Sequence, residues 1–283
     1  MSAISIITER LAPLDPRFAV THRQELIAGF DQAKFSATSC ILIGAGGIGS
    51  EVAEGLCRKG IGRLCILDHD VVEQTNLNRQ HFFKDDVHKN KAHCLVQNLA
   101  PHCHAGTVLE GHDLSFEDAV AVGVDLSAAV VVCGVDNGAA RVAVSQYFRR
   151  HAMPTIFINV DLLAECGHVF VQESTATTPC FGCAFPRTLH GGQAPCFVPA
   201  AKDILKVTAG FALYAIDSLL MKRNRNWNYR RVHLAGFAPD DIAILKRNLE
   251  CALCAHFELQ QGSPAVGTTS SRASTGSASP YPL

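Results

Sequence analysis

A glycine-rich segment near residue 45 has the composition of a phosphate-binding loop. The sequence GAGGIG supplies Gly44, Gly46, Gly47 and Gly49 directly after the apolar run CILI. Glycines at these positions let the backbone approach a phosphate, and the helix that follows presents free N–H groups to it. Asp68 stands about 20 residues further on, where a carboxylate can bind the ribose hydroxyls of a nucleotide. The pattern predicts nucleotide binding; the alternative is a turn that serves only helix–strand packing.

The polar residues beyond Asp68 favour a polyphosphate over a nicotinamide ring. Asn76 and Arg79 follow it closely, and Lys91 opens the next helical segment. Cations grouped there can bind phosphate oxygens and stabilise charge that develops during phosphoryl transfer. Asp136 ends the buried run VVVCGV, at the edge where α/β sheets bind ligands, and its carboxylate can hold Mg²⁺. The alternatives are an N-cap for Asp136 and a solvated surface charge for each cation.

Two pairs of cysteines have the spacing of a structural zinc site. They are Cys180 with Cys183, and Cys251 with Cys254. Two C-x-x-C pairs supply the four thiolates of a tetrahedral Zn²⁺ site. Since 67 residues separate the pairs, the metal would fasten a distant C-terminal segment to the core. The alternative is a redox pair or core cysteines without a metal.

Cys196 differs from these four cysteines because it lies in the Gly/Pro-rich stretch GGQAPCFVPAAKD. A helix is predicted to begin just after it, and His190 and Lys202 are near in sequence. A thiol near a helix N-terminus can have a lowered pKa and act as a nucleophile. The alternative is an inert loop thiol.

The elements that must position these residues alternate between helix and strand. The strands are too apolar to face water on one side, which predicts a Rossmann-like α/β fold, doubly wound around a largely parallel sheet. We expect it to carry the zinc-stapled C-terminal segment. The predicted helices cover 14–35, the segment after the glycine loop, 91–99, 139–151 and 201–222. The predicted strands are CILI, RLCIL, a weak strand near 107, AAVVVCGV, TIFINV and HVFVQES.

Composition narrows the class of protein further. The chain has 283 residues with 48% hydrophobic positions and a net charge of −1, so no basic surface predicts nucleic acid or an anionic membrane as a partner. The N-terminus lacks a signal-peptide pattern, and no apolar run approaches the length of a membrane span. With 12 cysteines, several of them in apolar strands, a reduced cytoplasmic protein is expected. Of the 22 residues in 262–283, 18 are Ser, Gly, Thr, Pro or Ala, so we expect a flexible tail after a domain spanning 1–261.

The motifs together identify a family. GAGGIG, DHDVVEQTNLNRQ, Lys91, GVDN and PCFGC occur in the order found in the ThiF/MoeB/HesA family, which is related to the enzymes that activate ubiquitin-like proteins. The resemblance covers residues 20 to about 257. The pattern D-x-D-x-V-x-x-x-N-x-x-R-Q is far more specific than the glycine loop.

The resemblance implies a role for each matching residue. Asp68 would be the ribose ligand, with Asp70 as its companion at the strand tip. Asn76, Arg79 and Lys91 would contact phosphates, and Asp136 would hold Mg²⁺. Residues 22–31, HRQELIAGFD, match an N-terminal family motif in which an arginine, here Arg23, reaches the partner subunit's site from a helical arm.

Two departures from the family pattern surround Lys91. The segment between Arg79 and Lys91 is one residue shorter than in MoeB-like members, and His88-Lys89-Asn90 replaces the usual glycine before the lysine. Lys89 is therefore a second candidate for the phosphate-binding lysine.

The resemblance implies an adenylating enzyme that uses ATP and Mg²⁺. Its partner would be a small ubiquitin-like or sulfur-carrier protein with a C-terminal glycine, and the enzyme would be a homodimer. Single-domain eukaryotic activators have a catalytic cysteine where this chain has Cys196, whereas MoeB-like members form no thioester there. The competing hypotheses are an NAD-dependent oxidoreductase and a non-catalytic nucleotide-bound scaffold.

Overall fold

One mixed sheet organises the described part of the chain. The computed structural model describes residues 2–12, 15, 19–161, 163–175, 177–186, 199–221, 223–236 and 238–254. Within these residues nine strands form the sheet, in the order β1-β4-β3-β2-β5-β6-β7-β8-β9. The strands are β1 (Ala3–Ile7), β2 (Ser39–Ile43), β3 (Arg63–Leu67), β4 (Val108–His112), β5 (Val130–Cys133), β6 (Thr155–Val160), β7 (Cys166–Gln172), β8 (Tyr229–His233) and β9 (Asp241–Ala243).

The centre of the sheet is parallel, and both edges are antiparallel. Strands β4, β3, β2, β5 and β6 run parallel to one another, whereas β1 pairs antiparallel with β4 and β7 to β9 continue antiparallel from β6. The chain builds outward from β2 through β3 to β4 and then returns to the other side of β2 as β5. The carboxyl ends of β2 and β5 therefore form a topological switch point, which is where sheets of this type bind ligands. The predicted Rossmann-like fold is confirmed.

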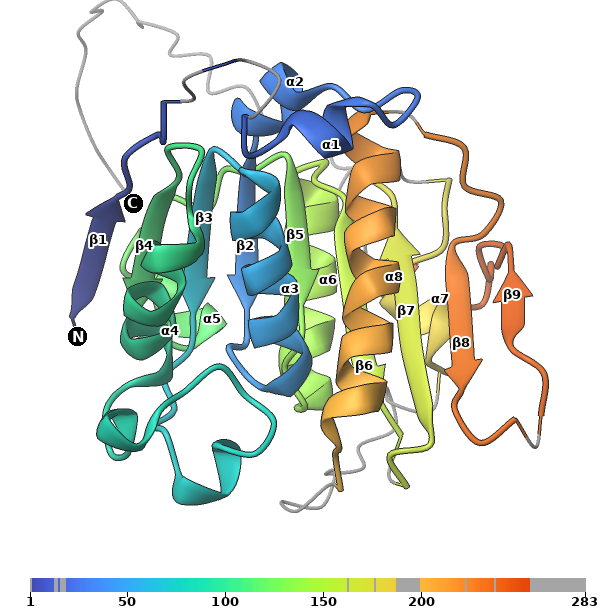
Figure 1. Cartoon of the computed structure of the whole chain (residues 1–283). Coiled ribbons are helices and arrows are strands. Elements are labelled where there is room, and N and C mark those ends of the chain that lie inside the picture. Colours follow the sequence, from blue (N-terminus) through green and yellow to red (C-terminus); the bar gives the residue numbers. More distant parts are fainter. Residues whose placement is uncertain are drawn as a thin grey trace, which may run out of the picture.

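Helices cover both faces of the sheet, as a doubly wound fold requires. Figure 1 shows α3, α4 and α8 in front of the sheet, with α5, α6 and α7 behind it. The helices are α1 (His22–Glu25), α2 (Gln32–Ser36), α3 (Gly47–Lys59), α4 (Lys91–Leu99), α5 (Phe116–Ala121), α6 (Gly138–Arg150), α7 (Phe181–Ala184) and α8 (Lys202–Met221). Three short 3₁₀ turns are η2 (Gln74–Asn76), η3 (Lys84–Asp86) and η4 (Ala100–His102).

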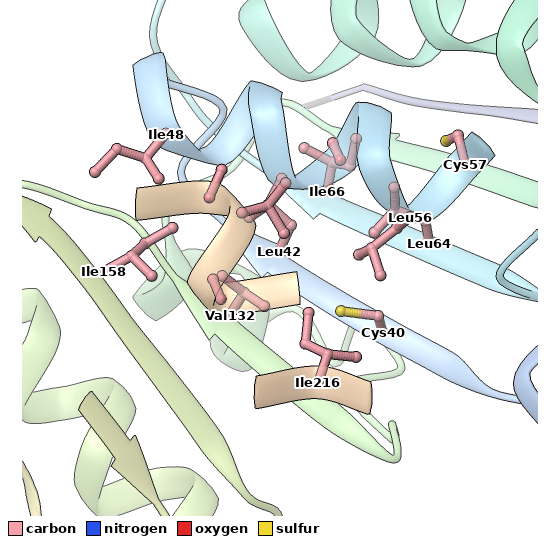
Figure 2. Close-up of a cluster of buried hydrophobic side chains, with 14 of the residues drawn as sticks. Cys40, Leu42, Ile48, Leu56, Cys57, Leu64, Ile66, Val132, Ile158 and Ile216 are labelled. Atoms are coloured by element: carbon pink, nitrogen blue, oxygen red, sulfur yellow. The ribbon is translucent and has the colours of Figure 1, made fainter. Parts of the chain in front are cut away.

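The core on the front face holds α3 and α8 against the central strands. Figure 2 shows α3 and α8 side chains over strand residues: Ile48, Leu56, Cys57 and Ile216 over Cys40, Leu42, Leu64, Ile66, Val132 and Ile158. The central strands are apolar on both faces because helices bury both sides of them. Cys40, Cys65 and Cys133 are completely buried strand residues, as the sequence predicted. This packing fixes the start of α3, where the glycine loop lies.

The predicted helix over 14–35 is wrong within the described residues. The structure has two short helices there, α1 and α2, joined by a turn. Gly29, in the segment between the two helices, takes a left-handed backbone (φ 79°). The Asp31 side chain then accepts a hydrogen bond from Lys34 N to start α2 (3.0 Å). A glycine in that conformation cannot continue an α-helix.

Helix α8 is the one described helix whose length and composition would suffice to cross a membrane. Its most apolar 18-residue window has a mean hydropathy of 1.5, and 56% of that window is buried inside the protein. It packs on α3, β6 and β7, and its Asp217 forms an ion pair with Lys59 of α3. These contacts show that α8 is apolar because it packs in the core of the protein.

Candidate functional site

The glycine loop joins β2 to α3 and is packed tightly against the loop after β5. Gly44 has a left-handed backbone (φ 96°), and a Cβ there would lie 3.0 Å from Gly134 C. A Cβ on Gly49 would lie 2.0 Å from Gly44 O, so the turn cannot close around a larger residue. A Cβ on Gly46, by contrast, would meet no atom within 4 Å. The loop is therefore closed toward the protein and open at Gly46, in front of the free N–H groups that begin α3.

Asp68 fastens the end of β3 to this loop. Its carboxylate accepts hydrogen bonds from Ala45 N (2.6 Å) and Asp70 N (2.9 Å). Asp68 is 9% exposed, and burial raises the pKa of its carboxyl. The Lys91 charge and the two backbone N–H groups act in the opposite direction and lower this pKa in part. Asp70 is more exposed and forms an ion pair with Lys91 Nζ at 2.9 Å. The D-x-D pair thus combines one buried carboxylate that shapes the loop with one carboxylate at the surface.

The structure distinguishes Lys91 from Lys89. The Lys91 side chain is 12% exposed and lies against the strand tip, whereas Lys89 is exposed. The Asn90 side chain caps α4 by accepting from His93 N (3.0 Å), and it donates to Asp68 O (2.8 Å). His88 has a left-handed backbone (φ 70°), which explains why a glycine is usual in this segment. The shortened segment therefore still places Lys91 beside the D-x-D pair.

Asn76 ends the 3₁₀ turn η2, which follows the D-x-D pair in the chain, and Arg79 lies three residues beyond it. Asn76 is buried, and its Oδ1 accepts from Glu73 N (2.9 Å) to close the turn. Arg79 Nη1 donates to Thr75 O and to Asn78 Oδ1 (3.0 Å). These bonds hold the guanidinium at the surface of the turn and leave most of its five donors for a ligand.

Asp136 is not the cap of α6. That position is taken by Asn137, whose Oδ1 accepts from Ala139 N (2.8 Å) and Ala140 N (3.3 Å). Asp136 is exposed, and among the described residues it forms no hydrogen bond or ion pair. Its carboxylate is free for a cation at the switch point between β2 and β5. The capping alternative for Asp136 is thereby removed.

The sequence did not predict a buried ionic cluster beside Arg79. Glu51, in the second turn of α3, is 6% exposed and pairs with Lys202 Nζ and with His81 Nε2 (3.3 Å). Lys202 also donates to Arg79 O (3.4 Å). Burial by itself would raise the pKa of Glu51, but the hydrogen bonds from His81 and Lys202 outweigh it and lower this pKa. The cluster fastens the start of α8 to the segment that carries Arg79, and its members are too far apart in sequence to form a motif.

Arg23 lies at the opposite end of the molecule from these residues. Its neighbour Gln24 donates to Lys59 O, the last residue of α3 (2.8 Å). Since α3 has 13 residues, about 20 Å separates its two ends. Figure 1 shows α1 at the end of the sheet away from the strand tips that carry the glycine loop. Arg23 therefore cannot join Arg79 and Lys91 within one subunit.

The four paired cysteines form one cluster. Their Sγ–Sγ distances are 3.7 Å for Cys180–Cys183, 3.6 Å for Cys180–Cys251, 3.5 Å for Cys183–Cys254 and 3.4 Å for Cys254–Cys180. Thiolates bound to one tetrahedral Zn²⁺ lie about 3.8 Å apart, because each Zn–S bond is about 2.3 Å. Asn248 N also donates to Cys183 Sγ (3.4 Å), a bond that fits a thiolate. The donor set and its spacing fit zinc.

The cluster is attached to the back of the sheet through α7. Phe181, between the first two cysteines, is 1% exposed and packs on Phe157 with a ring separation of 4.7 Å. Cys251 and Cys254 reach the cluster from the far end of the chain. Cys196 lies outside the described residues, as does the predicted tail at 262–283.

Comparisons with known proteins show the family of the chain. The model of the ThiF family matches residues 21–251. The chain is similar to the SAMP-activating enzyme E1 of Haloferax volcanii, with 30% identity over 189 residues, covering 63% of this chain and 65% of that protein. It is also similar to ubiquitin-like modifier-activating enzyme 5 of Oryza sativa subsp. japonica, with 34% identity over 171 residues, covering 54% and 39%. With adenylyltransferase and sulfurtransferase MOCS3 of Caenorhabditis briggsae it shares 25% identity over 255 residues, covering 82% and 59%.

The chain spans less than two thirds of the length of each of these relatives. Among solved structures, E. coli MccB with ATP superimposes with a TM-score of 0.71 at 20% identity, covering 85% of this chain and 75% of that one. At that identity the likeness shows the shared fold.

Proposed function

The chain belongs to the ThiF family, and from that premise we propose that it adenylates the C-terminal carboxylate of a small ubiquitin-like or sulfur-carrier protein. One observation carries the proposal. The glycine loop, Arg79, Lys91 and Asp136 come from four separate segments and lie around one edge of the sheet, at or beside the switch point. The relatives named as a SAMP-activating enzyme, a modifier-activating enzyme and an adenylyltransferase support the same reaction class.

The reaction requires positioning and charge stabilisation more than covalent chemistry. A carboxylate oxygen of the carrier attacks the α-phosphorus of ATP, the bond to the bridging oxygen breaks, and pyrophosphate leaves with the electron pair. Arg79 and Lys91 would bind phosphate oxygens, and the N–H groups at the start of α3 would receive the negative charge of the phosphate chain. Asp136 would hold Mg²⁺, which when bound neutralises charge on the phosphates.

The decisive experiment is carrier-dependent exchange of labelled pyrophosphate into ATP. We expect exchange only when a ubiquitin-fold carrier with a free C-terminal glycine is present. An NAD-dependent oxidoreductase would bind NAD and show no exchange, and a non-catalytic scaffold would bind ATP and show none. Tight NAD binding without ATP binding would overturn the proposal.

The four-cysteine cluster is proposed to hold a structural zinc ion. Its support is the set of four sulfurs with tetrahedral spacing and the N–H···S bond from Asn248. The ion would fasten the segment containing Cys251 and Cys254 to α7, which agrees with the expected zinc-stapled C-terminus. We also propose a reducing compartment such as the cytoplasm, because no disulfide joins the cysteines of the described residues.

A homodimer would explain the position of Arg23. Since Arg23 lies about 20 Å from the glycine loop of its own subunit, it can serve an active site only in a partner. Arg23→Ala and Asp136→Ala proteins should each be inactive, and mixing them should restore part of the exchange activity, because mixed dimers contain one intact site. Light scattering that shows only monomers, or mixing without recovery, would remove the trans role.

Capture of the acyl group as a thioester is a second step that some members of the family carry out and others do not. In the sequence, Cys196 is the thiol favoured to capture the acyl group as a thioester. The chemistry needs a nucleophilic sulfur near the adenylate carbonyl, and a reductant-sensitive carrier adduct would reveal it.

A further inference from the structure

A cysteine–histidine pair on the antiparallel part of the sheet includes none of the residues assigned above. Cys166 Sγ is 2.9 Å from His233 Nδ1. The two residues face each other directly in the register of β7 and β8. Among the free cysteines of the described segments, Cys166 is the one whose sulfur has a histidine nitrogen within hydrogen-bonding distance. A thiol beside an imidazole is the pair of groups that nucleophilic catalysis uses.

The pair lies at the same edge of the sheet as the adenylation residues. Cys133 at the end of β5 is level with Phe157 of β6, and Val160 of β6 is level with Gly167 of β7. Three residues of strand, about 10 Å, therefore separate the level of Cys133 from that of Gly167. Asp136 also follows Cys133 by three residues. Asp136, in the loop after β5, and the start of β7 therefore both lie at the carboxyl edge of the parallel strands, with only β6 between β5 and β7.

The sulfur also points to the face on which Asp136 enters α6. A Cβ on Gly167 would lie 1.9 Å from Thr208 Oγ1 of α8, so Gly167 faces α8 and its neighbour Cys166 faces the other side. Phe170, which shares the Cys166 face, belongs to the core that contains α6 and α7. Asp136 leads directly into α6. The thiol and the proposed Mg²⁺ ligand therefore share one face as well as one edge.

Local structure holds the pair in place. Asp161 Oδ1 accepts from Glu165 N (2.9 Å) and Cys166 N (3.1 Å), which fixes the turn before β7. Burial raises the pKa of the Cys166 thiol, and Asp161 raises it further. The sulfur is therefore a thiol at rest, and a base must remove its proton during attack. His233 Nδ1 is placed to do so.

We propose that Cys166 is an acyl acceptor of this enzyme, with His233 as its general base; the proposal rests on the adenylation proposed above. In the step, Cys166 Sγ attacks the carbonyl carbon of the acyl-adenylate while His233 Nδ1 takes the thiol proton. An S–C bond forms, the bond between the carbonyl carbon and the phosphate oxygen breaks, and AMP leaves with that electron pair. The imidazolium then returns its proton to water.

The exposure of the thiol matches the expected substrate. Cys166 is 8% exposed, so a chain end without side chains suits the approach to the sulfur best. A carrier ending in glycine meets that condition. A thioester formed there would also be protected from water, which slows its hydrolysis.

The experiment locates the thioester by peptide mass spectrometry after incubation of the full chain with ATP, Mg²⁺ and a glycine-terminated carrier. Pyrophosphate exchange is measured on every variant to normalise the adduct yield. With Cys196→Ala as background, the adduct should map to Cys166 and disappear with a thiol reductant, whose thiol takes the acyl group by exchange. When Cys166→Ser is added to Cys196→Ala, the adduct should be an ester, which resists the thiol reductant and is cleaved by mild alkali. His233→Asn, which keeps a polar atom near the Nδ1 position but supplies no base, should slow adduct formation about 10²-fold or more.

A matched control is Cys94→Ala, which removes a buried thiol of α4 and should leave the adduct at Cys166. Absence of an adduct in Cys196→Ala protein that still exchanges pyrophosphate would overturn the proposal. So would an equal rate of adduct formation in His233→Asn protein. If no carrier supports exchange, the adenylation proposal fails instead. The pair is then tested by iodoacetamide: Cys166 alkylation should slow in His233→Asn protein, and an unchanged rate would refute the base.

Discussion

The parallel and antiparallel halves of the sheet position their chemistry in different ways. In the parallel half the candidate residues follow strand ends: the glycine loop follows β2, Asp68 follows β3 and Asp136 lies beyond β5. In the antiparallel half Cys166 and His233 lie within paired strands and meet through register. Residues on loops can change without disturbing strand pairing, whereas residues in a ladder are fixed by it. The proposed adenylation and the proposed acyl capture therefore depend on separate structural supports, and we expect that each can be disabled separately.

The largest effect is expected in the parallel half, from Asp136→Ala. This change removes the free carboxylate proposed to hold Mg²⁺ and should lower carrier-dependent pyrophosphate exchange about 10²-fold or more. The neighbouring Asn137→Ala is the matched control, since Asn137 caps α6. It should cost about 1 kcal/mol of stability and much less activity. Equal losses of exchange in the two variants would mean that Asp136 acts only through the structure of the loop.

The next effect concerns the zinc ion proposed for the antiparallel half. Wild-type protein should contain about one zinc ion per chain, and Cys251→Ser protein should lose it. Atomic emission on protein purified without chelator measures both. Closing a loop of this length is worth about 4 kcal/mol by the chain-entropy argument used for disulfides, which corresponds to a fall in Tm of roughly 10 °C. Cys254→Ser should behave alike. Wild-type protein without zinc would refute the site.

The two halves also differ in what the sequence could predict. β2, β3, β5 and β6 were predicted because each is an apolar run bounded by turns, and the strand tips then bring the motif residues together. β8 was missed because its sequence, YRRVH, has no apolar pattern; pairing with β7 and the Arg231–Asp241 ion pair stabilise it instead. β1, α5 and β9 were missed as well.

Within the site, the sequence could predict the residues of motifs but not the pairs formed by tertiary contact. Asp68, Arg79, Lys91 and Asp136 follow from motifs with fixed spacing. The pairs Glu51–Lys202 and Cys166–His233 arise from tertiary contact between remote segments, and no local pattern announces them. Tertiary packing decides such contacts, so only the structure reveals them.

A smaller effect should appear in the pH dependence of stability. Burial, with the nearby cation Arg231, lowers the pKa of His168 to about 4. Its ordinary value is about 6.5. Between these values the unfolded chain binds a proton that the folded chain does not, so stability falls as pH drops from about 6.5 to about 4. His168→Asn should make Tm less sensitive to acid in that range, as measured by calorimetry. The exposed His69→Asn, in the parallel half, is the control; equal pH slopes for wild type and His168→Asn would contradict the assignment.

The smallest effect is expected at His88, and its sign is what matters. His88 has a φ of 70°, and its N–H donates to Val72 O (2.8 Å), which folds the segment before Lys91 back onto the strand tip. A left-handed backbone costs a residue with a side chain about 1–2 kcal/mol. Glycine avoids that cost but loses about 0.5–1 kcal/mol through the greater freedom of the unfolded chain. His88→Gly should therefore stabilise the protein by about 0.5 kcal/mol, whereas Lys89→Gly, which relieves no left-handed strain, should destabilise it by a similar amount. Denaturant unfolding of both variants measures the difference directly. If His88→Gly is the more destabilising of the two, the imidazole itself holds the segment, and the departure from glycine here reflects a contact rather than tolerated strain.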